Sequence, residues 1–203
     1  MRSGVLDILK KDGFRVIVFL NGASVEIPRY LREELEDGQV ILENVCDVPR
    51  QKGYRRFAKL TSLFVLSKST WYHSRMGSNL NRAFFWKYLE LVFSLAVGNL
   101  HSLKTLTRFL EKKMFVQDIY GSYFHKYKPV LVFSTSIVSG ALDIEMMKEA
   151  ERRGVRTVSM PKGWDNVAKT LYRFVPDVLI VQNERMRISG GPIQGISKNK
   201  TRV

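Results

Sequence analysis

The sequence has little cysteine and no recognisable metal-ligand spacing. Cys46 is the only cysteine among the 203 residues, so an internal disulfide and a multi-cysteine metal site are excluded. The three histidines are scattered, without a carboxylate pair nearby, and no Gly-x-Ser-x-Gly elbow is present. We therefore predict no metal site, no cofactor and no nucleophilic serine. The catalytic residues stay unidentified at this point.

A signal peptide and a long apolar run are also lacking. Charged residues interrupt any apolar run near Met1. The most apolar stretch, residues 83–100, is broken by Lys87 and Glu90, and its uninterrupted part is too short to span a bilayer. We expect a cytoplasmic protein that binds, at most, peripherally to the inner face of the plasma membrane.

Acidic residues are few compared with basic ones. Lysine and arginine number 33 against 19 acidic residues, which gives a formal net charge of +14. Such a surface attracts polyanions, whether nucleic acid, anionic lipid or phosphorylated substrates. No nucleic-acid-binding motif is recognisable, and the basic residues are spread along the chain. A basic nucleic-acid-binding module is therefore kept only as an alternative, and nucleic acid is not the partner we expect.

What the sequence does contain is an alternation of strand and helix patterns. Short runs rich in β-branched and aromatic residues predict strands, and helical patterns lie between several of them. Strands without internal alternation indicate a parallel sheet that is covered on both faces, as in a Rossmann-like doubly wound α/β fold. The predicted strands are residues 14–20, 39–45, 129–135, 155–160 and 176–183.

A helical segment interrupts this alternation from about residue 50 to about residue 127. We predict one domain over residues 1–186 with this helical insertion. The polar, glycine-containing tail, residues 187–203, is predicted to be flexible or outside the native reading frame. Because the chain starts on a helix, where a doubly wound domain normally starts on a strand, we also expect truncation at both ends.

Hydroxyl side chains follow the strand at residues 129–135. Ser134, Thr135 and Ser136 stand between this strand and the start of the next helix. Free N–H groups at such a position attract anions or acceptor hydroxyls, and ligands of parallel sheets bind beyond the carboxyl ends of the strands. Helix capping is the simpler interpretation of these residues.

A second loop at a strand end, residues 157–170 (TVSMPKGWDNVAKT), combines an aromatic ring with a carboxylate and a carboxamide. Trp164 could stack on a sugar ring or on a facing domain, or close the edge of the sheet. Asp165 could orient an acceptor hydroxyl or act as a base. Alternatively, Asp165 and Asn166 stabilise the turn itself. Lys162 and Lys169 could contact a phosphate, but an ordinary solvated lysine is the simpler interpretation of each.

The segment 129–186 resembles the amino-terminal domain of two-domain GT-B glycosyltransferases of bacterial surface (capsular or lipo-) polysaccharide synthesis. Related chains carry a Ser-Trp-Asp-Asn-Leu-Thr loop, of which Trp164, Asp165 and Asn166 match here. From residue 3 to residue 128 the resemblance rests on the order of elements alone. The flanking positions of the loop differ, with Gly163, Val167 and Ala168 in place of Ser, Leu and Thr.

The resemblance implies the acceptor-side half of a glycosyltransferase, hexosyl- or glycerophosphotransferase-like. The nucleotide-sugar donor would bind to a carboxyl-terminal domain, for which 203 residues leave no room. The half would be inactive alone, and its own partner would be a glycan or lipid-linked acceptor. Half of a nucleotide-sugar epimerase-like enzyme shares this architecture and stays an alternative. The expected substrate-binding residues are Trp164, Asp165, Asn166, Ser134, Thr135 and Ser136.

A basic stretch at the start of the helical segment suggests a contact with membrane lipid or phosphate. Aromatic and apolar residues recur beside it at helical spacing, and such a helix can rest on an anionic lipid surface. A core-facing helix with a basic outer face is the alternative. The basic residues are Arg50, Lys52, Arg55, Arg56 and Lys59.

Overall fold

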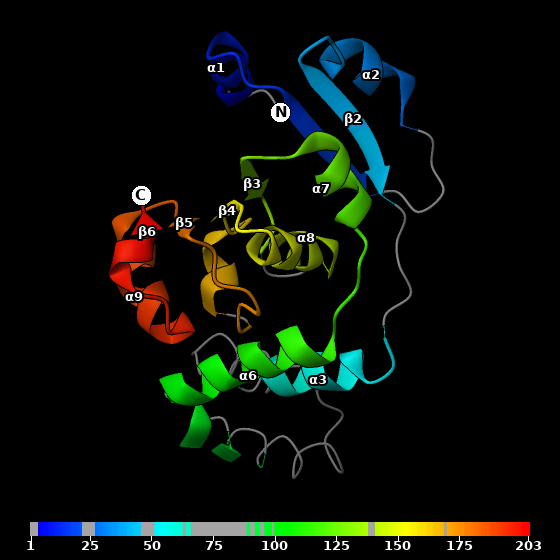
Figure 1. Cartoon of the computed structure of the whole chain (residues 1–203). Helices are drawn as coiled ribbons and strands as arrows, with labels where there is room; N and C mark the ends of the chain where they lie inside the picture. Colours follow the sequence, from blue (N-terminus) through cyan, green and yellow to red (C-terminus); the bar gives the residue numbers. More distant parts are fainter. Residues whose placement is uncertain are drawn as a thin grey trace. The chain divides into compact units, whose positions relative to one another are not determined.

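The fold is an α/β fold with parallel sheets, as the sequence predicts (Figure 1). The computed structural model divides the chain into two compact units, Met1–Pro49 and Arg50–Val203. For Asn21, Arg55, Lys59, Ser62, Ala141, Trp164 and Asp165 the structure describes the backbone alone. The residues that it describes are 4–21, 27–45, 51–62, 64–65, 89, 92–93, 96–98, 100–137, 141–168 and 170–203.

The first unit contains two parallel strands, each preceded by a short helix. The β-branched run of β1 (Val16–Asn21) pairs with β2 (Val40–Val45) in the register Val16↔Val40 to Asn21↔Val45. Helix α1 (Val5–Lys11) ends before Gly13, whose positive φ of 79° suits a residue without a side chain. Helix α2 (Arg29–Leu35) packs on β2.

The turn before β2 is held by one carboxylate. Asp37 accepts hydrogen bonds from the backbone N–H groups of Gln39 (2.9 Å) and Val40 (2.8 Å) and from Nζ of Lys10 (2.5 Å). The Lys10 hydrogen bond, followed by the two backbone hydrogen bonds, lowers the pKa of Asp37 to about 2. The end of α1 is thereby joined to the start of β2 through an exposed ion pair.

The second unit begins with three described helices, α3 (Tyr54–Ser62), α6 (His101–Met114) and α7 (Gly121–Tyr127). The described residues of the predicted helical insertion are largely helical, but residues 115–120 between α6 and α7 are not. Residues 66–88 lie outside the described residues. Phe115 joins α3 to α6, because its ring lies 5.5 Å from that of Tyr54 and 5.2 Å from that of Phe57.

A parallel sheet of four strands in the order β3-β4-β5-β6 follows. Helix α8 (Ala141–Arg152) connects β3 to β4, the 3₁₀ helix η1 (Trp164–Ala168) lies between β4 and β5, and α9 (Glu184–Gln194) precedes β6. Gly154, with φ of 69°, follows the end of α8, where a left-handed conformation favours glycine. The strands are β3 (Leu131–Ser134), β4 (Arg156–Ser159), β5 (Val178–Ile180) and β6 (Thr201–Arg202).

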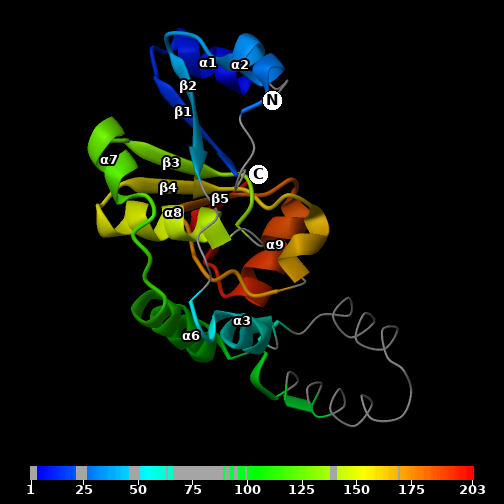
Figure 2. The same ribbon diagram turned by 90° about the vertical axis from the view of Figure 1, so that its right-hand side faces the viewer.

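One face of this sheet carries the core of the second unit. Helix α8 packs on β3 and β4 and α9 packs on β6, and Figure 2 shows both helices beneath the strands. Parallel strands that follow one another in sequence order have their right-handed connections on the same face, which explains this arrangement. Val132 and Leu179 are buried against the helices, whereas Leu131 and Phe133 are about half exposed on the opposite face. The described burial of β3 thus alternates, although the sequence shows a continuous apolar run.

The carboxyl-terminal tail differs from its prediction. Residues 187–203, predicted to be a flexible or non-native tail, continue α9 and supply the short 3₁₀ helix η2 (Lys198–Lys200) and β6. Gln194 is fully buried, and Ile196 belongs to the same core cluster as Tyr172 and Leu179. The polar composition of this segment does not reveal its burial, because the buried Gln194 is itself polar and its amide is hydrogen-bonded inside the core.

Candidate functional site at the strand ends

Two serines end neighbouring strands at the carboxyl edge of the four-stranded sheet. Ser134 of β3 and Ser159 of β4 are partners in the strand register, and both are buried. The hydroxyl of Ser159 donates to the backbone oxygen of Ser134 at 3.1 Å, and the N–H of Met160 donates to the same oxygen at 3.0 Å. The edge is therefore closed by hydrogen bonds, and the Ser134 side chain is held toward the helix that follows.

The partner of the Ser134 hydroxyl is Asp143 in the first turn of α8. Ser134 Oγ donates to Asp143 Oδ1 at 2.9 Å and accepts from the N–H of Ser136 at 3.2 Å. Burial raises the pKa of the Asp143 carboxyl, while the hydrogen bond from Ser134 and the charge of Lys162 act in the opposite direction. A half-buried carboxylate with a basic residue nearby thus lies just beyond the sheet edge.

The charge of the exposed Lys162, in the loop after β4, acts on this carboxylate by lowering its pKa. The loop continues into η1, whose backbone carries Trp164, Asp165 and Asn166. The N–H of Asn166 donates to the backbone oxygen of Gly163 at 3.2 Å, so the tight turn forms here. Both predicted loops therefore leave from adjacent ends of β3 and β4, because parallel neighbours end at the same edge.

The predicted site residues have different surroundings. Ser134 and Ser136 are buried, Thr135 is exposed and Asn166 is half-buried. The side chains of Trp164 and Asp165 lie outside the described part of the chain, so their predicted roles stay predictions. Among the basic residues of the predicted lipid contact, Lys52 and Arg56 are exposed at the start of α3. Arg50 lies outside the described residues, as do the side chains of Arg55 and Lys59.

Asp143 is the residue that sequence reasoning missed as a site residue. In the sequence it is simply an acidic residue in the first turn of a helix, where the helix dipole favours negative charge. The signal that could have identified Asp143 is its short separation in sequence from the end of β3. When the helix after a strand packs back on that strand, as α8 does on β3, side chains in its first turn lie close to the end of the strand.

A second group of charged side chains lies between α6, α8 and the loop before β5. Nζ of Lys148 lies 2.8 Å from Glu145 and 3.5 Å from Glu111, and the Arg173 guanidinium lies 3.5 Å from Glu111. Burial raises the pKa of Glu111, whereas the charges of Arg173 and Lys148 oppose that rise. All of these residues are buried, so the group connects elements and offers no surface to a substrate.

The described residues contain neither a metal-ligand cluster nor a membrane-spanning helix. Among the residues that the structure describes, no group of three or more histidine, cysteine or acidic side chains could hold a metal ion. Within the same residues, no helix has the length and apolar character needed to cross a bilayer. Comparisons of the chain with protein-family models, with curated proteins and with solved structures find no match.

Proposed function

We propose that this chain binds the acceptor in a glycosyltransferase reaction of surface-polysaccharide synthesis. The observation that carries the proposal is the hydrogen bond from Ser134 to Asp143 beside Lys162, where two parallel strands end. The loop from β4 continues from this group into η1, which carries the Trp-Asp-Asn sequence. Sugars are recognised by such a combination, since carboxylates and amides accept and donate to hydroxyls and an aromatic ring packs on a sugar face.

Each residue has a role in this proposal. The Asp143 carboxylate accepts a hydrogen bond from an acceptor hydroxyl, and Ser134 positions that carboxylate. Lys162 lies against the phosphate of a lipid-linked acceptor or against a sugar oxygen. Trp164 stacks on the sugar ring, with Asp165 and Asn166 at its rim. The donor nucleotide sugar binds elsewhere, and the chain acts in the cytoplasm against the inner face of the plasma membrane.

Glycan binding by the full chain tests the proposal. Saturation-transfer NMR with a panel of surface-polysaccharide oligosaccharides should identify at least one binder. Asp143→Asn and Trp164→Ala should each weaken its binding about tenfold, as expected for one charged hydrogen bond or one stacked ring. Glu151→Gln, which makes the same carboxylate-to-amide change at the other end of α8, is the matched control. Equal binding by Asp143→Asn and the control would refute the assignment of the site.

Catalysis provides a separate test. With a nucleotide-sugar donor and the same glycan, the chain alone should transfer no sugar, because the proposed site contains only acceptor-binding groups. Transfer by the chain alone would contradict an acceptor-side role, even if the glycan-binding results agree with it.

A further inference from the structure

Helix α6 has its charged side toward the protein and its apolar side toward solvent. Its buried residues are Lys104, Thr107, Arg108 and Glu111. The opposite side carries Leu106, Phe109, Leu110 and Met114, which are 50%, 55%, 39% and 60% exposed. These four residues, called here the α6 outer face, follow helical spacing and form one stripe. An amphipathic helix of a globular protein ordinarily has the reverse orientation.

Hydrogen bonds to the end of α9 and to Tyr172, which lies before β5, fix this orientation. Arg108 donates from Nε to the backbone oxygen of Tyr172 at 2.7 Å and from its NH2 group to that of Gln194 at 2.6 Å. Nζ of Lys104 donates to the backbone oxygen of Ile193 at 2.5 Å. The last carbonyls of a helix have no partner within it and carry partial negative charge, so two buried cations are suited to this position. The outer face is therefore left uncovered by the contacts that hold α6 in place.

Exposing Lys104 and Arg108 by rotating α6 would break several buried contacts. Burial lowers the pKa of Arg108 to about 10, so that it is still charged at neutral pH. Rotating α6 to hide its apolar stripe would remove both cations from their carbonyl partners and would also separate Glu111 from Lys148 and Arg173. Among the described residues, these contacts hold α6 with its apolar stripe exposed.

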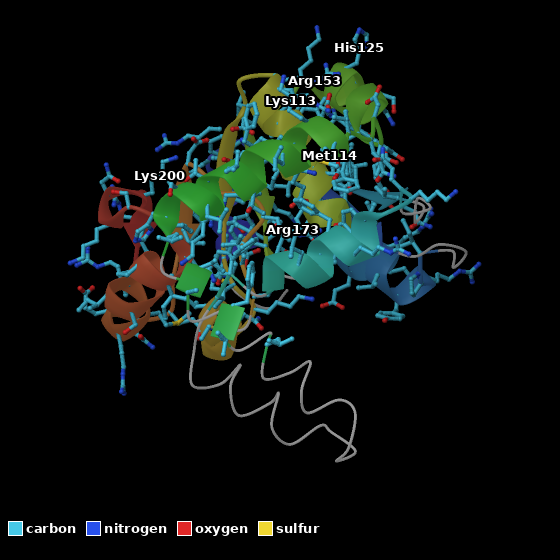
Figure 3. The ribbon with its side chains drawn as sticks, turned by 90° about the horizontal axis from the view of Figure 1, so that it is seen from below. Lys113, Met114, His125, Arg153, Arg173 and Lys200 are labelled. Atoms are coloured by element: carbon cyan, nitrogen blue, oxygen red, sulfur yellow. The ribbon has the colours of Figure 1, made fainter. Side chains whose placement is uncertain are left out.

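One basic residue lies on the α6 outer face, and two more lie on the neighbouring helix α3. Lys113 lies within the stripe at helical spacing, with its Nζ 5.9 Å from the centre of the Phe109 ring. Helix α3 lies beside α6 through the contact between Phe57 and Phe115. The exposed Lys52 and Arg56 are at its amino-terminal end. Figure 3 shows α3 and α6 next to each other, with Lys113 and Met114 labelled on α6.

We propose that the α6 outer face docks on an anionic membrane surface, with its apolar side chains at the boundary between headgroups and acyl chains. Lys113, Lys52 and Arg56 would lie against the lipid phosphates. Such an amphipathic surface binds through its buried apolar area together with attraction to anionic lipid. The inference names the surface for the peripheral membrane contact in the proposed function, and it uses no residue of the strand-end site.

Other occupants fit the surface less well. A second copy of the chain would bring two surfaces of the same sign together, and each chain carries a formal charge of +14. Nucleic acid would match the positive charge but would leave the apolar stripe without a complementary surface. Anionic lipid satisfies both the apolar and the basic part.

Vesicle sedimentation with the full chain tests the inference. The chain should partition onto phosphatidylcholine vesicles that contain about 30% phosphatidylglycerol and should bind pure phosphatidylcholine much more weakly. The double variant Leu106→Glu/Phe109→Glu should bind the anionic vesicles at least about tenfold more weakly, because two apolar contacts are lost and two repulsive charges are added. Lys113→Gln should weaken the same binding about fivefold, since one basic residue is lost.

Matched controls separate this surface from charge in general. Gln182→Glu/Ser189→Glu adds two acidic residues at exposed positions outside α6 and so matches the charge change of the double variant. Circular dichroism and melting of each variant check folding. Partitioning that falls equally in the stripe variant and the matched pair would overturn the inference, because charge alone would then explain it.

Two further outcomes would also overturn it. Sedimentation of the chain as a dimer without lipid, and of the stripe variant as a monomer, would identify a second copy as the occupant. A gel shift with RNA that the stripe variant loses and the matched pair keeps would identify nucleic acid instead. Glycan binding should stay unchanged in the stripe variant, so failure of the membrane inference can be told apart from failure of the glycan site.

Discussion

Gln194 offers the sharpest test of how the second unit is built. Its side chain is fully buried between α9 and the segment that follows η1. Nε2 donates to the backbone oxygens of Val167 at 2.7 Å and Thr170 at 2.9 Å, and Oε1 accepts from the N–H of Tyr172 at 2.8 Å. One amide thus satisfies three backbone groups that no regular secondary structure serves.

Replacing this amide has a cost that can be worked out from these contacts. Gln194→Met keeps roughly the same volume and loses the three hydrogen bonds, each with a net value of about 1 kcal/mol, so we expect about 3 kcal/mol of destabilisation. Gln194→Ala adds a cavity and should cost about 1–2 kcal/mol more. Against a total stability of about 5–15 kcal/mol, either change is large.

Urea unfolding followed by circular dichroism measures the effect. Gln182→Ala, at an exposed position just after β5, is the control and should change the free energy of unfolding by less than about 0.5 kcal/mol. A Gln194→Met variant as stable as this control would refute the reasoning. Such a result would mean that residues 187–203 contribute nothing to the core, as a flexible tail would.

Three other changes have defined outcomes. Gly190→Ala should destabilise the chain by about 1–3 kcal/mol in the same urea assay, because the new Cβ would overlap Cγ1 of Val167, and Ser189→Ala should not. An NMR titration of Asp37 should have its midpoint near pH 2, and Lys10→Met should move it toward the ordinary 3.8; a midpoint already at 3.8 would exclude the Lys10 contact. The stabilising contribution of Asp37 should accordingly be complete above pH 3.8 and disappear as the pH falls toward 2. As the pH falls, glycan binding through Asp143 should weaken with a midpoint above pH 3.8, because burial raises the pKa of that carboxyl. Ser134→Ala should move this midpoint higher, because it removes the hydrogen bond that lowers the pKa, and a midpoint below 3.8 would contradict the site.

The strands from β1 to β5 could be predicted because each carries a local signal. The apolar run at 14–20 became β1, and the run at 129–135 became β3. Gly13 and Gly154 end their helices with positive φ, which few other residues tolerate. The pairing of the two predicted loops also followed from sequence, because β3 and β4 are consecutive parallel strands and therefore end at one edge.

The carboxyl-terminal residues could not be predicted because their stabilisation is not local. Gly190 and Gly191 weaken any helix prediction, and Pro192 lies inside α9. Glycine is needed at 190 because Val167 of η1 occupies the space that a side chain would fill. The sequence around residue 190 contains no sign of that contact, since its partner is more than twenty residues away.

Helix α6 shows the same limitation for the face of a helix. Periodicity reveals the stripe of Leu106, Phe109, Leu110 and Met114, and a stripe of this kind normally predicts the buried side. Here the charged side of α6 is buried instead, because the carbonyls at the end of α9 need donors. Lys104 and Arg108 lie one turn apart on α6 and supply them. Hydrogen bonds to charged groups are each stronger than neutral ones, and an unpaired buried cation would cost several kcal/mol, so these contacts outweigh exposure of four apolar side chains. A surface that lipid can bind thus results from the way in which a neighbouring helix ends.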